Sequence, residues 1–130
     1  MKNIEFKAVK KKYDETTVIQ ELNFSIKEGE RLVLLGPSGC GKTTTLRMIA
    51  GLEEISEGQL LMGGTVVNSV APGKRNIAMV FQNYALFPNL TVAENIAFGL
   101  HKKQWSTEEI QFRVNELLHL IELPNIAEKY

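Results

Sequence analysis

One glycine-rich stretch constrains this chain more than any other, because residues 36–44 read Gly-Pro-Ser-Gly-Cys-Gly-Lys-Thr-Thr. The stretch matches the pattern G-x-x-x-x-G-K-[ST] without a gap. Residues 31–35 before it are mostly apolar and of strand length, and Leu46, Ile49 and Ala50 after it share one face of a helix. A glycine-rich loop between a strand and a helix is the context in which this pattern binds phosphate, so we expect a phosphate-binding loop here.

The residue types of the loop suit a triphosphate. Gly36, Gly39 and Gly41 lack a Cβ atom, so the loop can curl and point its N–H groups inward. A helix that begins near Lys42 adds free N–H groups and about half a positive charge at its N-terminus. The Lys42 ammonium can reach the β- and γ-phosphates, and the Thr43 hydroxyl can ligate Mg²⁺. The alternative is a glycine-rich turn that only caps a helix, and the lysine, the threonine and both flanking elements argue against it.

The composition excludes several kinds of protein. The chain has 130 residues, enough for one domain with a modest core, and its 15 Lys and Arg balance 15 Asp and Glu. Net neutrality gives no reason to expect a broad nucleic-acid surface, without excluding a local one. Cys40 is the only cysteine, which rules out an internal disulfide and fits a reducing compartment. No apolar run approaches the roughly 18 residues of a membrane span, and no signal peptide is visible, so we expect a cytosolic protein unless a partner holds it at a membrane.

The rest of the sequence predicts a mixed α/β fold. Ile4, Phe6 and Ala8 alternate with charged residues, which predicts a strand over residues 4–9 with one solvated face. Residues 77–81 are almost continuously apolar, as in a strand buried on both faces, and Gln82 stands at their C-terminal end. Further strands are predicted over residues 16–26, 31–35, 59–62 and 65–67.

Three helices are predicted. The first runs to about Ala50 and stops at Gly51, and the second begins at a capping box over residues 91–94 and ends near Gly99. The third begins at a second capping box over residues 106–109 and stops before Pro124. Its predicted apolar stripe consists of Ile110, Val114, Leu117, Leu118 and Ile121. A strand, loop and helix followed by further strands favours a parallel α/β sheet, with the first two strands as an antiparallel side layer.

The acidic half of a nucleotide site is missing from this sequence. Phosphoryl transfer with such a loop usually needs a carboxylate at the end of another apolar strand to organise Mg²⁺. Asp14 is the only aspartate, and it lies in a predicted turn beside lysines, where a structural role is expected. No glutamate follows an apolar strand, and neither His101 nor His119 is expected to be catalytic.

Three features resemble the ATP-binding cassette (ABC) family, the nucleotide-binding subunits of ABC transporters. Residues 36–44 resemble its Walker A motif, and residues 80–95 (Val-Phe-Gln-Asn-Tyr-Ala-Leu-Phe-Pro-Asn-Leu-Thr-Val-Ala-Glu-Asn) resemble its Q-loop segment. Tyr13 stands where the family places an aromatic residue against adenine. The sequences of these motifs most resemble those of bacterial importers of the iron, polyamine, sulfate and maltose type. The resemblance implies a P-loop NTPase parallel sheet with an antiparallel β side layer and the start of a helical subdomain.

The family pattern implies a role for each matching residue. Tyr13 would stack on adenine, with Val18 near the base and ribose; the alternative for Tyr13 is a partly exposed turn aromatic. Gln82 would touch Mg²⁺ and the attacking water, unless it is only a polar strand-end residue. Residues 84–90 would help form a groove for a helix of the membrane subunit, or would be local core. Lys42 and Gln82 are thus the expected catalytic residues, and Thr43 and Gln82 the expected metal ligands. The implied phosphate-binding residues are Gly36, Pro37, Ser38, Gly39, Cys40, Gly41, Lys42, Thr43 and Thr44.

The resemblance implies an ATPase subunit that uses ATP and Mg²⁺ to drive solute import. Its expected partners are membrane permease subunits and a second nucleotide-binding subunit in a head-to-tail dimer, at the cytoplasmic face of the membrane and without nucleic acid. The family's signature, Walker B strand and switch histidine do not occur here, so residues 1–130 are expected to be the N-terminal portion of one ATP-binding domain, inactive alone. Two alternatives are a soluble ABC-type ATPase without a membrane partner and a fragment that binds ATP without hydrolysing it. A GTPase or small-molecule kinase is excluded, because Asn-Lys-x-Asp is absent and Asp14 is the only aspartate.

Overall fold

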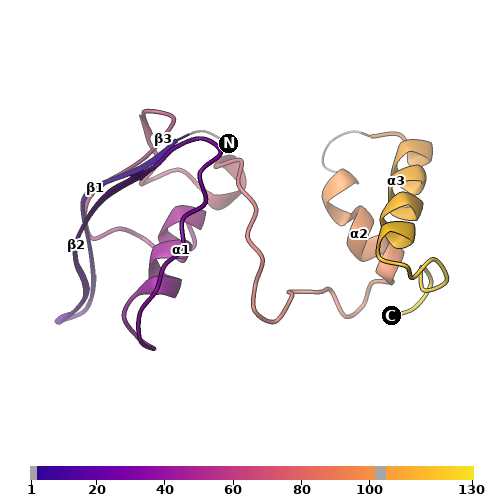
Figure 1. Ribbon diagram of the computed structural model, residues 1–130, viewed down its shortest axis with the longest axis horizontal. Coiled ribbons are helices and arrows are strands. Elements are labelled where there is room, and N and C mark those ends of the chain that lie inside the picture. The colour runs from indigo at the N-terminus through magenta and orange to yellow at the C-terminus, as the bar shows by residue number, and fades with distance from the viewer. Residues whose placement is uncertain (1–2, 102–104) are drawn as a thin grey trace. The chain divides into compact units, whose positions relative to one another are not determined.

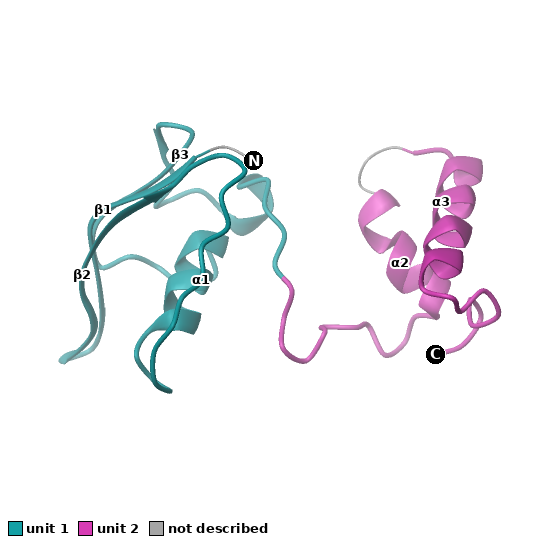
Figure 2. Ribbon diagram, in the orientation of Figure 1, with its two compact units in different colours: residues 1–79 teal, residues 80–130 magenta. Residues whose placement is uncertain are grey.

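The computed structural model describes residues 3–101 and 105–130, and the chain forms two compact units (Figures 1 and 2). Unit 1 spans residues 1–79 and contains a β-sheet and helix α1 (Lys42–Ala50). Unit 2 spans residues 80–130 and contains helices α2 (Val92–His101) and α3 (Thr107–Leu120). Each unit buries its own cluster of apolar side chains.

Unit 1 is built on a four-stranded antiparallel sheet with the strand order β2-β1-β3-β4. The strands are β1 (Ile4–Tyr13), β2 (Thr16–Ile26), β3 (Glu57–Met62) and β4 (Thr65–Val66). A short 3₁₀ helix, η1 (Pro72–Lys74), follows β4. The strands predicted over residues 4–9, 16–26, 59–62 and 65–67 are therefore confirmed, and β1 continues further than predicted. The antiparallel side layer expected from the sequence is this sheet.

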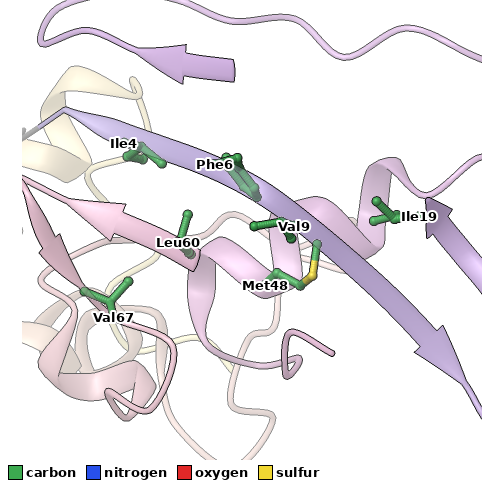
Figure 3. Packing of buried hydrophobic residues seen from close by; sticks show 7 residues of the cluster. All are labelled: Ile4, Phe6, Val9, Ile19, Met48, Leu60 and Val67. Carbon is green, nitrogen blue, oxygen red and sulfur yellow. The ribbon is translucent and has the colours of Figure 1, made fainter. Parts of the chain in front are cut away.

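The core of unit 1 lies between the sheet and helix α1. Phe6 and Val9 of β1, Leu60 of β3 and Met48 of α1 are almost completely buried. Figure 3 shows Val9 and Met48 pointing toward each other, which fastens the helix to the central strand. Phe6 also stacks on Phe24 of β2 with ring centroids 4.5 Å apart, so the same side chain joins two strands.

A β-bulge in β1 overturns one predicted orientation. Ala8 was expected to face the core, but it has a φ of 48° and is exposed, and the register of β1 shifts between Phe6 and Val9. The Ala8 N–H donates to Asn23 Oδ1 at 2.7 Å instead of continuing a regular ladder. The extra residue reverses the alternation of inward- and outward-facing side chains along β1. Val9 is therefore fully buried and Lys11 is only 7% exposed.

Two predicted strands are not strands in the structure. Residues 31–35 and 77–81 carry no strand assignment, and Leu35 and Val80 are 88% and 89% exposed. A strand requires a neighbouring strand to accept and donate its backbone hydrogen bonds. Neither segment pairs with another part of the described chain, so the parallel sheet expected from the sequence is not formed by these residues.

The predicted helices are all present. Helix α1 ends where predicted, because Gly51 adopts a left-handed conformation with φ 75° and its N–H bonds back to the helix. Its predicted apolar stripe is only partly right. Leu46 is 49% exposed, while Thr45 and Met48 are buried together with Ala50.

Unit 2 is a pair of helices that both begin at the predicted capping boxes. Thr91 Oγ1 accepts from the Glu94 N–H at 3.2 Å, and the Glu94 carboxylate accepts from the Thr91 N–H at 2.7 Å. Ser106 and Glu109 form the same reciprocal pair at the start of α3. The helices share a small core of Ala97, Ile110, Val114 and Leu118. Leu117 is half-buried. Ile121 lies past the end of α3 and is 53% exposed, contrary to its predicted place in the stripe.

Within the described parts of the chain, no helix combines the length and apolar character needed to cross a membrane.

Candidate functional site

The glycine-rich loop adopts the backbone that its sequence predicts. Gly39 and Gly41 have φ values of 81° and 93°, in the left-handed region that side chains disfavour. A Cβ on Gly41 would also lie 3.0 Å from Ile19 Cγ1, whereas a Cβ on Gly39 would meet nothing. At Gly36 a Cβ would come within 2.6 Å of Cys40 Sγ. The loop is therefore closed tightly at both ends and open in its middle.

Lys42 folds back into the mouth of this loop. Its ammonium donates to the carbonyl oxygens of Gly36 and Pro37, each at 2.7 Å, and lies 3.5 Å from Cys40 Sγ. A lysine ammonium is a compact charge with three donors. The loop thus holds one positive charge at its centre, where the oxygen atoms of an anion can share it.

The N-terminus of α1 leaves backbone donors without a side-chain cap. Gly41 precedes the helix and has no side chain that could accept a hydrogen bond, and the first turn contains no acidic residue. Thr45 fixes this turn, because its N–H and its hydroxyl both donate to the Gly41 carbonyl at 2.8 and 2.9 Å. The free N–H groups and the positive end of the helix dipole together favour an anion at this point.

The remaining loop side chains are accessible. Thr43 is exposed in the first turn of α1, and Thr44 beside it is half-buried. The other exposed residues of the loop are Gly36, Pro37, Ser38, Gly39 and Cys40. The Thr43 hydroxyl is therefore available to a ligand of the loop.

A pocket of about 330 Å³ adjoins the loop. Its lining residues come from β2, from the segment before the loop and from the start of α1: Val18, Ile19, Gln20, Glu21, Leu22, Leu34, Leu35, Cys40, Gly41, Lys42 and Thr45. Val18, predicted to lie near a base and ribose, is thus brought next to the phosphate loop.

Tyr13 lies at the end of β1, beside the β1–β2 turn, and is 41% exposed. Figure 1 shows this hairpin tip and the glycine-rich loop at the same end of unit 1. The ring does not line the pocket itself, and the ammonium of Lys11 sits over one of its faces, 4.4 Å from the ring centroid. The contact of Tyr13 with Lys11 was not predicted from the sequence.

Gln82 lies in unit 2, in a turn over residues 82–85, and is exposed. The predicted strand before it is absent, so Gln82 does not stand at a strand end. Tyr84 and Ala85 adopt positive φ values of 59° and 49°, and Tyr84 and Leu86 are 77% and 68% exposed. Tyr84 and Leu86 are therefore not part of a local core, whereas Leu90 is half-buried.

Asn95 organises this loop, and no sequence pattern singles it out. Its amide donates to the carbonyls of Phe87, Leu90 and Thr91 at 3.0–3.1 Å, and its Oδ1 accepts from the Phe87 N–H at 2.9 Å. Phe87 in turn packs on Phe98 with ring centroids 4.3 Å apart. The first turns of α2 thus hold the segment that follows Gln82.

Arg75 likewise holds backbone segments together at the C-terminal end of α1. Only 8% exposed, it donates to the carbonyls of Met48 and Ile49 at 2.7 and 3.1 Å and to those of Asn68 and Val70 at 3.3 and 2.8 Å. Burial lowers the pKa of its guanidinium. A Cβ on Gly51 would lie 2.6 Å from Arg75 Nε, so this glycine also makes room for the arginine. No pattern in the sequence identifies such a contact.

The described residues contain no group of three or more His, Cys, Asp or Glu side chains that could hold a metal ion. Thr43 offers one hydroxyl. Mg²⁺ commonly takes one or two protein ligands and fills its other positions with substrate phosphates and water. The donor set fits a magnesium ion that enters with a phosphate ligand, and does not fit a cage made by protein alone.

Comparison with known proteins agrees with these features. The family model described as "ABC transporter" matches residues 19–130. The chain is 46% identical over 126 residues to the spermidine/putrescine import ATP-binding protein PotA of Haemophilus influenzae, covering 97% of this chain and 34% of that protein. It is 48% identical over 129 residues to the sn-glycerol-3-phosphate import ATP-binding protein UgpC of Cereibacter sphaeroides (99% and 37%). It is 46% identical over 129 residues to the maltose/maltodextrin import ATP-binding protein MalK of Yersinia pestis (99% and 35%).

The chain spans about a third of the length of these curated relatives. The match to the family model begins at residue 19, so it covers most of unit 1, all of unit 2 and all of the glycine-rich loop. The glycine-rich loop, the uncapped helix after it and the family model all point to the same family. The chain belongs to the ABC transporter family.

Proposed function

We propose that this chain supplies the phosphate- and base-binding part of an ATPase subunit that drives solute import. One observation carries the proposal. The ammonium of Lys42 is held by the carbonyls of Gly36 and Pro37 at the mouth of a glycine-rich loop, directly before a helix without a side-chain cap. Charge, free donors and close backbone approach are what a triphosphate requires.

Each residue has a proposed role in that site. The loop from Gly36 to Thr44 binds the phosphates, with Lys42 as the cation beside the β- and γ-phosphates. Tyr13 stacks on the adenine, and Val18 contacts the base and ribose. Gln82 contacts the Mg²⁺ and the attacking water, and the exposed segment after it reports to the membrane subunit.

Magnesium is proposed to arrive with the nucleotide. Thr43 would hold the ion through its hydroxyl, together with Gln82, while the phosphate oxygens and water supply the other ligands. The ion would neutralise charge on the phosphates during transfer. Support comes from the exposed hydroxyl of Thr43 in the first turn of α1.

The wider assembly is also a proposal. We infer that residues 1–130 are part of one ATP-binding domain, whose parallel sheet would use residues 31–35 and 77–81 as strands. Their exposed apolar side chains support this. The complete domain would pair head-to-tail with a second copy and bind permease subunits at the cytoplasmic face of the membrane.

The transported solute is proposed to be selected elsewhere in the transporter. Relatives named for polyamine, glycerol phosphate and maltose import are 46%, 48% and 46% identical to this chain. Near-equal similarity to proteins named for chemically different solutes supports a shared ATP-binding function.

The test is nucleotide binding and turnover by the full-length protein, with and without its permease subunits. Lys42→Ala should abolish turnover and weaken binding of MgATP, whereas Lys27→Ala, an exposed lysine in the same unit, should change neither. ATP binding that survives Lys42→Ala undiminished would refute the proposed phosphate site. Turnover that never responds to the permease would instead refute the proposed coupling to import.

A further inference from the structure

A buried ion pair lies directly behind Tyr13. The Lys11 ammonium is 2.7 Å from Glu53 Oε1, and the two side chains are only 9% and 16% exposed. The same ammonium lies 4.4 Å from the centroid of the Tyr13 ring, which is within the range of a cation–π contact. Hydrogen bonds from Lys11 and, secondarily, Tyr13 hold the pKa of the Glu53 carboxyl below its ordinary value. The carboxylate therefore holds the cation that covers the Tyr13 ring.

Burying this lysine needs a reason beyond stability. Lysine is among the residues least often buried, and a buried ion pair often contributes no more stability than an apolar pair of the same size. The β-bulge at Ala8 is what turns Lys11 toward the interior. Its neighbours Lys10 and Lys12 face outward and share the exposed carboxylate of Glu57, each at 2.8 Å. Three successive lysines thus have two distinct environments, and only Lys11 contacts an aromatic ring.

The pair also reaches the helix that binds phosphate. Glu53 follows the C-terminal end of α1, and its Oε2 lies 3.7 Å from Arg47 Nε on the last turn of that helix. Glu53 therefore connects the end of β1 to the helix whose first residue is Lys42. A ring fixed to this carboxylate keeps its position relative to the phosphate loop.

We propose that Lys11 and Glu53 are positioning residues that hold the Tyr13 ring for base stacking and so determine how much of the nucleotide affinity comes from the base. This rests on the proposed role of Tyr13 in adenine binding. Lys11 covers one face of the ring, and the exposed remainder of Tyr13 receives the base. Neither positioning residue touches the phosphates.

The experiment compares two ligands of the full-length protein: MgATP, and magnesium tripolyphosphate, which has the phosphates without a base. Equilibrium dissociation constants give the ratio of the two affinities for each variant. Lys11→Met and Glu53→Gln should each weaken ATP binding by about tenfold, as expected from the loss of one stacking contact, and leave tripolyphosphate binding unchanged. Lys10→Met and Lys12→Met are the matched controls, because their ammonium groups contact only the exposed Glu57; both should bind like the natural protein.

Tyr13→Ala separates the two levels of the proposal. If it lowers the affinity ratio and Lys11→Met and Glu53→Gln do not, the positioning role is wrong and the base site stands. If Tyr13→Ala itself leaves the ratio unchanged, the base site is wrong and the positioning role falls with it. Combining Lys11→Met with Tyr13→Ala should add nothing to Tyr13→Ala alone, and additive losses would contradict the proposal. Circular dichroism shows whether Lys11→Met folds. If it does not, Glu53→Gln and Lys11→Arg replace it in the test. Lys11→Arg conserves the charge and should retain the ratio of the two affinities.

Discussion

Gly39 and Gly41 use the same backbone region for different reasons. Both have positive φ values, but only Gly41 lies against a neighbouring side chain, that of Ile19. The glycine-rich loop therefore contains one position, Gly39, where only the backbone conformation requires glycine, and another, Gly41, where the available space requires it as well.

We expect Gly41→Ala to destabilise the protein more than Gly39→Ala. An alanine at either site pays about 1–2 kcal/mol for the left-handed conformation. At Gly41 the new methyl group must also displace Ile19, which lies 3.0 Å from the built Cβ. Thermal unfolding midpoints of the two variants measure the difference, and equal midpoints would show that the Ile19 contact relaxes freely.

Glu57 should contribute to acid unfolding. Hydrogen bonds from Lys10 and then Lys12 lower the pKa of its carboxyl from 4.5 to about 2. A carboxyl with a lowered pKa stabilises the folded state fully above the unfolded-state value, and this contribution is lost as pH falls from about 4.5 toward 2. Unfolding by denaturant at several pH values measures the free energy of unfolding. Between pH 4.5 and 2 this free energy should fall less in Glu57→Gln than in the natural protein. The same pH dependence in both proteins would contradict the assignment.

Single polar side chains fix whole elements in this chain. Arg75 joins the C-terminal end of α1 to the segment after β4, and Asn95 joins the start of α2 to the loop before it. Both act on backbone carbonyls, which is why neither belongs to a recognisable motif.

Arg75→Met should destabilise unit 1 by about 2–4 kcal/mol, because buried carbonyl groups lose their donor. Arg75→Lys should recover only part of this, since an ammonium cannot reach all the carbonyls that the planar guanidinium reaches. Arg113→Met is the control: Arg113 forms an exposed pair with Glu116, so its loss should change stability by less than about 0.5 kcal/mol. Chemical denaturation compares the three variants, and similar losses in Arg75→Met and Arg113→Met would refute the role of Arg75.

Asn95→Asp should loosen the segment between Gln82 and α2 more than Asn95→Ala. Both variants lose the donor to the carbonyls of Phe87 and Leu90, and the aspartate additionally places a negative charge against them. Faster exchange of the Leu90 amide hydrogen, which donates to the Phe87 carbonyl in the same turn, is the readout, because an aspartate would keep an oxygen that accepts from the Phe87 N–H. Unchanged exchange in both variants would show that the Phe87–Phe98 contact holds the loop alone.

At the scale of the whole chain, residues 31–35 and 77–81 belong to no helix or strand and carry exposed apolar side chains such as Leu35 and Val80. Such segments are complete only when other strands pair with them. We expect slow amide hydrogen exchange over both segments in the full-length protein and fast exchange in a 130-residue chain produced alone. Fast exchange in both proteins would show that neither segment belongs to a sheet.

Features that depend on a few neighbouring residues could be predicted from the sequence. The helix after the glycine-rich loop, the stop at Gly51 and the capping boxes at Thr91 and Ser106 all occur where predicted, because glycine conformations and helix caps are decided within one turn of chain. The same local signals pointed to Lys42 and Thr43 in the loop.

Features that depend on distant partners were decided only by the tertiary structure. Residues 31–35 have strand composition, yet no strand forms where no neighbour pairs with it, and the bulge at Ala8 reversed an alternation that looked regular. The contact of Lys11 with Glu53 joins side chains from two separate elements, which no local pattern records. Backbone pairing and side-chain burial depend on residues that are far apart in the sequence. Their contribution to the free energy of folding therefore exists only once the chain has folded.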